Sequence, residues 1–453
     1  MEYNIFRIAD EQSAFDISVI ADFLNKNKVI CSNRYLPLER AYRNDYEIFH
    51  QKKKEDYKPD NRVAVNFAKY IADTMTGFFI GVPVKTTCDD AAIKAYVEMV
   101  DAYNDQDDGN AELAKITSIY GRGYEMLYVD ENGQIGITHL RPTEAFMIYD
   151  DSVLQRPRAF VRYYLDSDNY LHGSVSDETT VRYFTNKGSA LHFTEEENAH
   201  GFDGVPAVEY VENEERMGIY ESAMPIINAY NKALSEKAND VDYFSDAYLK
   251  IVGPHVDEKA VQQVRSNRIL NIETDGTSGT ADAEFMGKPS ADTTQENLLN
   301  RLERQIFSTS MVANINDENF GTASGIAIRY RLWAMSALAQ TKERKFTSGM
   351  NRRYKLIFSN PASAMPKDGW TQLHFSFTRN YPANLSDEAD IASKLAGITS
   401  KETQLGVLSC VDDAAAEMQR MREEEEESET DGWPTARTDG NEKLLEEPPE
   451  DEV

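Results

Sequence analysis

The sequence has few cysteines and no long apolar run. Its three cysteines, Cys31, Cys88 and Cys410, are far apart and odd in number. They predict neither a disulfide framework nor a metal-binding spacing, and we expect a reducing compartment. The apolar run Phe78–Val84 is far shorter than the ~20 residues needed to cross a bilayer. The N-terminus lacks the charged-then-apolar layout of a signal peptide, so we expect no contact with a membrane.

The sequence also lacks the signatures of common catalytic sites. It has no phosphate-binding loop of the Gly-x4-Gly-Lys type, no Gly-x-Ser-x-Gly, no His-Glu-x-x-His and no Cys-x-x-Cys. The acidic stretch Asp105–Gly109 superficially resembles a calcium loop, but its twelfth position is Ile116 rather than glutamate. We interpret it as a polar connection between helices. The sequence therefore predicts no enzyme activity, no metal and no cofactor.

Basic charge is scarce. There are 48 lysines and arginines against 77 aspartates and glutamates, which gives a net charge of −29. Such a surface repels nucleic acid unless basic residues are concentrated somewhere. Two interpretations remain open: plain solubility, or a wall that must not hold a sliding polyanion. The basic run Lys52–Lys54 is either a solvated helix end or a small nucleic-acid patch, and the first is the more common case.

The first half of the chain has mixed periodicity. Residues 10–60 have a helical pattern, with one helix from Arg34 to Lys54. A helical stripe from Val63 to Phe78 precedes a strand that starts at Val82. Residues 89–120 predict two helices around a polar break at 104–110. Short alternating runs then predict six strands of an antiparallel α+β domain, at 125–130, 135–140, 145–149, 159–165, 170–175 and 180–185.

The second half is dominated by helices. Long helical patterns cover 222–247, 292–312 and 326–359, and the first has one strongly polar face that includes Asn231 and Asn239. Strands are expected at 248–252, 269–272, 283–286 and 372–378, and acidic helices at 386–396 and 400–424. The tail after Arg422 carries too little apolar surface to fold alone and is expected to be disordered.

The stretch Asn61–Thr87 resembles a known family. Its Asn-Phe-Ala-Lys-Tyr-Ile, the Asp that follows and Gly-Phe-Phe-Ile-Gly-Val-Pro-Val are similar to the signature of portal proteins from tailed phages, in the branch of siphophages that infect Gram-positive bacteria. The resemblance covers nearly the whole chain. Further blocks that support it are Gly204-Val-Pro-Ala, Glu212-Asn-Glu-Glu, Tyr243-Phe-Ser-Asp and Ser400-Lys-Glu-Thr.

This resemblance implies an α+β portal fold with a mixed wing domain, long stem helices, a small clip module and a helical crown. Mapped onto the chain, it predicts the following parts: 1–60, an N-terminal helical segment; 61–217, the wing, rich in strands after 121; 218–247, the first stem helix; 248–291, the clip; 292–313, the second stem helix; 314–325, the channel loop; 326–382, a long wing helix and a returning strand; 383–424, the crown; and 425–453, a disordered acidic tail.

The resemblance also implies a function without chemistry. Portal proteins form a ring, usually of twelve copies, at one capsid vertex of the virion. The ring is the conduit for double-stranded DNA during packaging and ejection, and it is assembled in the host cytoplasm. The implied partners are the terminase large subunit, the scaffold, the major capsid protein and head-completion proteins. Two other classes remain open: a phage adaptor or scaffold that does not contact DNA, and an enzyme with an unrecognised site.

The candidate functional residues lie in and around the polar loop 314–325. As a channel loop it would present neutral donors to phosphates, while its two acids would repel them; as a connector it would merely join helices. Four nearby arginines would either pair with acids or reach DNA, and pairing is the more common case. The loop candidates are Asn316, Asp317, Glu318, Asn319, Phe320, Gly321 and Thr322, and the arginines, assigned to the channel or to contacts between subunits, are Arg301, Arg304, Arg329 and Arg331.

Overall fold

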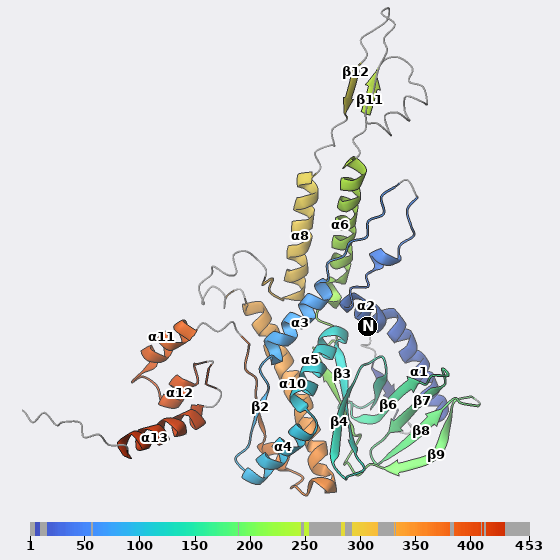
Figure 1. Cartoon of the computed structure of the whole chain (residues 1–453). Helices are drawn as coiled ribbons and strands as arrows, with labels where there is room; N and C mark the ends of the chain where they lie inside the picture. The colour runs from blue at the N-terminus through green and yellow to red at the C-terminus, as the bar shows by residue number, and fades with distance from the viewer. Residues whose placement is uncertain are drawn as a thin grey trace, which may run out of the picture. The chain divides into compact units, whose positions relative to one another are not determined.

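The computed structural model divides the chain into two compact units, Met1–Asn380 and Tyr381–Val453, and each is described by itself. The first unit combines a six-stranded sheet, a three-stranded sheet and two two-stranded sheets with helices, which confirms the predicted α+β class (Figure 1). The residues that the structure describes are 5–9, 16–55, 58–188, 190–245, 249–252, 282–285, 292–315, 330, 332–380, 385–408, 410–411 and 414–430.

The larger sheet has six strands in the order β1-β5-β6-β7-β8-β9. Only the β1–β5 pair is parallel, because β1 comes from the far N-terminus rather than from a hairpin. Predicted strands correspond to β5 through β8, whereas β9 was missed because its run of glutamates is exposed and not typical of a strand. The strands are β1 (Phe6–Ile8), β5 (Ala145–Asp150), β6 (Pro157–Leu165), β7 (Leu171–Ser176), β8 (Thr180–Thr185) and β9 (His192–Ala199).

The smaller sheet has the order β10-β3-β4, built from β3 (Arg122–Val129), β4 (Ile135–Leu140) and β10 (Ala207–Val211). Its β3–β4 hairpin matches the predicted strands. Helix α5 (Gln106–Tyr120) packs on β3, and Gly123 allows a close approach, because a Cβ there would lie 2.8 Å from Ile116. Helix α4 (Ala91–Tyr103) precedes α5. The connection between them is only Asn104 and Asp105, so the polar break is shorter than predicted.

The N-terminal segment begins with α1 (Ile17–Ile30), which is capped by Asp16 and continues through a π turn (Cys31–Tyr35) into α2 (Leu36–Tyr42). The predicted helix from Arg34 to Lys54 is therefore wrong beyond Tyr42, because Asn44 takes a left-handed conformation and ends it. A 3-10 turn (Glu47–His50) follows, and Lys52–Lys54 lies in an irregular loop rather than at a helix end.

Helix α3 (Phe67–Ile80) is central to the core. Asn66 caps it by accepting from the Lys69 N–H at 3.1 Å. Its predicted stripe is buried except for Val63, which precedes the helix and is partly exposed. The strand predicted at Val82 begins later, as β2 (Lys85–Thr87), and pairs with β13 (His374–Ser376) within the predicted returning strand.

Helix α10 (Trp333–Ser359) holds the first unit together through two buried ion pairs. The Lys342 ammonium lies 2.5 Å from Glu212 and also donates to Ser118 and to the Ala114 carbonyl. Arg353 binds Glu125 through two bonds of 2.6 Å. All four charged side chains are at most 1% exposed. The sequence predicted the apolar stripe of α10 but not these buried charges, which lie between apolar positions of the same helix.

The second unit contains α11 (Leu385–Leu395), α12 (Lys401–Leu405) and α13 (Ala414–Thr430). The helix predicted over 400–424 is therefore two helices. The tail prediction is wrong for 425–430, because α13 continues through these residues, where glutamates favour helix. Residues 431–453 lie outside the described part. Across the described residues, no helix is long and apolar enough to cross a membrane.

Candidate functional site: the pair of helices α6 and α8

Two long helices run side by side away from the two larger sheets of the first unit (Figure 1). They are α6 (Met224–Ser245) and α8 (Asp292–Ser310), close to the predicted ranges 222–247 and 292–312. Between them in the chain, β11 (Leu249–Val252) and β12 (Asp282–Phe285) match the strands predicted at 248–252 and 283–286, and they pair antiparallel; the strand predicted at 269–272 lies outside the described residues. Polar contacts link the helices: Lys237 pairs with Glu296, and Gln295 donates to Asp240 at 2.7 Å.

Aromatic rings join this pair to α3. Phe67 packs edge-on against Tyr230 of α6 and Phe307 of α8, with ring centroids 5.0 and 5.8 Å apart. Tyr70 packs against Phe307, and its hydroxyl accepts from the Ile315 N–H at 2.8 Å. Such edge-to-face contacts are directional as well as apolar. The stretch that carries the family resemblance therefore fixes the base of both helices.

An extended segment, Asn61–Val65, lies along α6 and is bound by its side chains. The N–H groups of residues 61, 63 and 65 donate to Asn239, Ser235 and Asn231, at 2.6, 3.0 and 2.9 Å. Two residues of extended chain rise about 6.6 Å and four residues of helix about 6.0 Å. The spacings match, so alternate N–H groups of the segment meet every fourth residue of α6. We call these contacts the polar ladder.

The polar ladder explains the polar face of α6. Asn231, Ser235 and Asn239 are at most 6% exposed, so this part of the predicted polar face does not face solvent. Asparagine and serine favour such places because their short side chains can satisfy a backbone that has no strand partner. Lys54 adds an ion pair with Glu236 at 2.8 Å, which gives the predicted basic run a structural role at one of its three lysines.

Helix α8 separates its charges by face. Glu296 pairs with Lys237, and Glu303 accepts from Asn314 at 3.1 Å. On the opposite side, exposed residues recur at spacings of three and four and include no acid. Arg301 and Arg304 lie there, and neither forms an ion pair with a residue that the structure describes. This acid-free face of α8 consists of Thr294, Asn297, Arg301, Arg304, Gln305 and Ser308.

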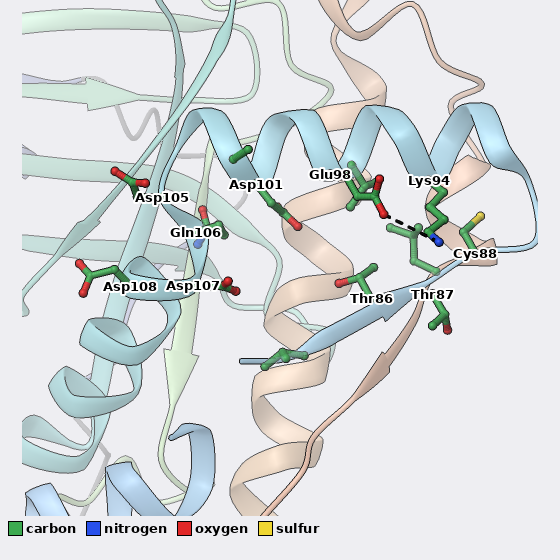
Figure 2. Close-up of a pocket in the computed structure, with 14 residues that line it drawn as sticks. Thr86, Thr87, Cys88, Lys94, Glu98, Asp101, Asp105, Gln106, Asp107 and Asp108 are labelled. Carbon is green, nitrogen blue, oxygen red and sulfur yellow. Dashed lines mark ion pairs between the residues drawn. The ribbon is translucent and has the colours of Figure 1, made fainter. Parts of the chain in front are cut away.

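A separate cavity of about 660 Å³ lies beside α4, α5 and β2 (Figure 2). Its wall includes Glu98, Asp101, Asp107 and Asp108, with Lys94 as a cation 3.8 Å from Glu98. Burial raises the pKa of Asp101, although the Tyr354 hydroxyl, 2.7 Å away, opposes the shift. Among the described residues, no group of three His, Cys, Asp or Glu side chains is placed to hold a metal ion. Of the acidic stretch, only Asp105 lies in the helix connection expected from the sequence, because residues 106–109 form the first turn of α5.

Comparison with known proteins places this chain in a family. A family model described as phage portal protein, SPP1 Gp6-like, matches residues 32–431. The chain belongs to this family. It is 24% identical over 423 residues to the portal protein of Bacillus phage SPP1, which covers 87% of this chain and 82% of that protein. It is 22% identical over 381 residues to the portal protein of Clostridium phage phiCD119, covering 78% and 82%.

Membership in the SPP1 Gp6-like portal family confirms the resemblance that the sequence carries, and the function is that of a phage portal protein. The positions predicted to act within that function are only partly visible. Arg301 and Arg304 lie on the acid-free face of α8. Residues 316–322, Arg329 and Arg331 lie outside the described residues, so their assignment stays a prediction. The polar ladder was missed, although Asn231, Ser235 and Asn239 at spacings of four are its signal.

Proposed function

We propose that the protein forms a closed ring of about twelve copies at one vertex of the capsid. The ring is the conduit for double-stranded DNA during packaging and ejection. It docks the terminase large subunit during packaging and head-completion proteins afterwards, and it contacts the scaffold and the major capsid protein during assembly. Family membership is the observation that carries this proposal. The extended α6–α8 pair supports it, because a lone copy leaves large apolar side chains such as Val241 and Leu298 exposed.

The ring is tested on the purified full chain by native mass spectrometry and negative-stain imaging. We expect a mass close to twelve copies of 51.3 kDa and a ring with an axial opening. A stable monomer that melts cooperatively would contradict the proposal and favour an enzyme. An open or compact assembly without an axial opening would favour an adaptor or scaffold that does not contact DNA.

We further propose that the acid-free face of α8 is turned toward the DNA and that residues 316–322 are the channel loop. The wall of a DNA channel must let the DNA slide past it. Two arginines among amide and hydroxyl side chains can make a few weak contacts to phosphates without binding the DNA tightly. The channel wall would therefore not be acidic everywhere. Most of the chain's surface repels DNA because of its acidic residues, whereas the acid-free face of α8 can lie next to DNA without repelling it.

The test compares two variants in assembled rings. Arg301→Gln with Arg304→Gln removes the charge from the acid-free face, and Lys232→Gln removes an exposed lysine from α6 as a matched control. Duplex binding should be weak, roughly 10⁻⁴ M at physiological salt. Its dependence on salt should become shallower in the arginine variant and stay unchanged in the control, because each phosphate contact adds about 0.9 to the slope. An unchanged slope in the arginine variant would place that face elsewhere.

A further inference from the structure

Two large aromatic side chains are exposed at the start of α10 and just before it. Trp333 is 73% exposed and Tyr330 is 76% exposed, although Leu332 and Met335 beside them are buried in the main core. The buried neighbours fix the orientation of this turn, so the exposure of Trp333 is set by the fold. Within the described residues, the indole has no hydrogen bond, ring contact or ion pair.

Among the described residues, the exposed positions at the start of α10 carry no charge. The exposed positions of the first two turns of α10 include Ala334 and Ala337, and the first charged exposed residue on that side is Arg344. By contrast, the exposed faces of α6 and α8 carry Lys232, Glu236 and Arg301. We call Tyr330, Trp333, Ala334 and Ala337 the aromatic patch. The bulky indole is therefore exposed beside two small alanines.

We propose that the aromatic patch docks onto a second copy of this chain and is a contact that closes the ring. This inference rests on the proposed ring. Interface cores are depleted in charge and enriched in tryptophan and tyrosine, and such residues supply a large share of binding energy. Copies that each carry a net charge of −29 repel one another. They can approach most closely where neither presents an acid, which is the character of this patch.

Tryptophan fluorescence tests the contact directly, because the chain has three tryptophans and two can be replaced. In the full chain with Trp370→Phe and Trp433→Phe, Trp333 is the single reporter. As the protein assembles with rising concentration, its emission should shift to shorter wavelength and become shielded from iodide quenching. Trp333→Ala should raise the concentration at half-assembly by about tenfold or more, while Trp333→Phe should restore most of the loss.

The matched control is Leu154→Ser, since Leu154 is also apolar and 68% exposed but lies in the turn between β5 and β6. It should assemble like the unaltered protein. If no ring forms at any concentration, the proposed function fails. If rings form while Trp333 keeps a solvent-like emission, or if Trp333→Ala assembles normally, the aromatic patch is not a subunit contact. If the emission changes only when duplex DNA is added to rings, the patch contacts DNA and this inference is overturned.

Discussion

The sheet-bearing body and the α6–α8 pair both contain buried polar groups, but they use them differently. In the body, Arg353 with Glu125 and Lys342 with Glu212 are full charges sealed inside one copy. Along α6, the buried groups are neutral amides and a hydroxyl that hold an extended backbone. Leaving a buried charge without its partner costs more than leaving a buried neutral group unsatisfied. We therefore expect substitutions at these polar groups to destabilise the body more than the helix pair.

The largest expected effect comes from breaking a buried charge pair in the body. Arg353→Met leaves the Glu125 carboxylate buried without its cation, and such changes cost about 3–5 kcal/mol. The thermal midpoint at fixed protein concentration should fall steeply. Lys367→Met, which breaks the exposed pair with Asp203, should cost no more than ~1 kcal/mol.

A second variant tests whether the loss of stability comes from the orphaned charge rather than from lost packing. Adding Glu125→Leu to Arg353→Met removes the orphaned charge and should recover part of the stability, since apolar replacement of a whole buried pair is often tolerated. Equal melting temperatures for Arg353→Met and Lys367→Met would contradict the contrast between buried and exposed pairs.

A smaller, local effect is expected in the polar ladder. Ser235→Ala removes the hydroxyl that accepts from the Val63 N–H and donates to the Val63 carbonyl, both at 3.0 Å. Backbone groups left unsatisfied cost about 1–3 kcal/mol. Hydrogen exchange at residues 61–65 should accelerate while the body stays protected. Lys232→Ala, on the exposed side of α6, is the control and should leave that exchange unchanged; acceleration across the whole body would mean that the ladder is part of the core.

The stability of the sheet-bearing body should also depend on pH through one buried acid, Asp101. Burial raises the pKa of Asp101 above its usual value, so the folded state holds this proton more tightly than the unfolded state does. Stability from this group therefore falls as pH rises from the unfolded pKa through the folded one. Asp101→Asn keeps an acceptor for the Tyr354 hydroxyl and should raise the melting temperature near pH 7, with the gain vanishing in acid. A gain for Asp101→Asn that persists unchanged in acid would contradict this assignment.

Periodicity predicted most elements because it follows burial, and burial follows the fold. It failed where a side chain binds a backbone group or another side chain that is far away in the sequence. Lys342 and Glu212 are 130 residues apart, and nothing local indicates their pairing. Strand β9 was missed because its glutamates sit at an exposed edge, where charge discourages unwanted pairing. The aromatic patch was not foreseen, since Trp333 falls within an ordinary helical pattern and its exposure appears only in three dimensions.

The smallest effect on stability, and a large one on function, is expected for the predicted channel loop. Loop residues that bury little core change stability by no more than about 0.5 kcal/mol when substituted. Replacing Asp317 and Glu318 with lysine exchanges repulsion of phosphate for attraction, repeated in every copy of the ring. Moving DNA would then meet a ring of ion pairs, so proheads should assemble normally but retain little nuclease-protected DNA.

The double replacement with asparagine and glutamine is the control, because it removes repulsion without adding attraction and should package nearly normally. Full packaging by the lysine variant would remove this loop from the axis and make it a connector between helices, which would leave the acid-free face of α8 as the remaining candidate for contact with DNA.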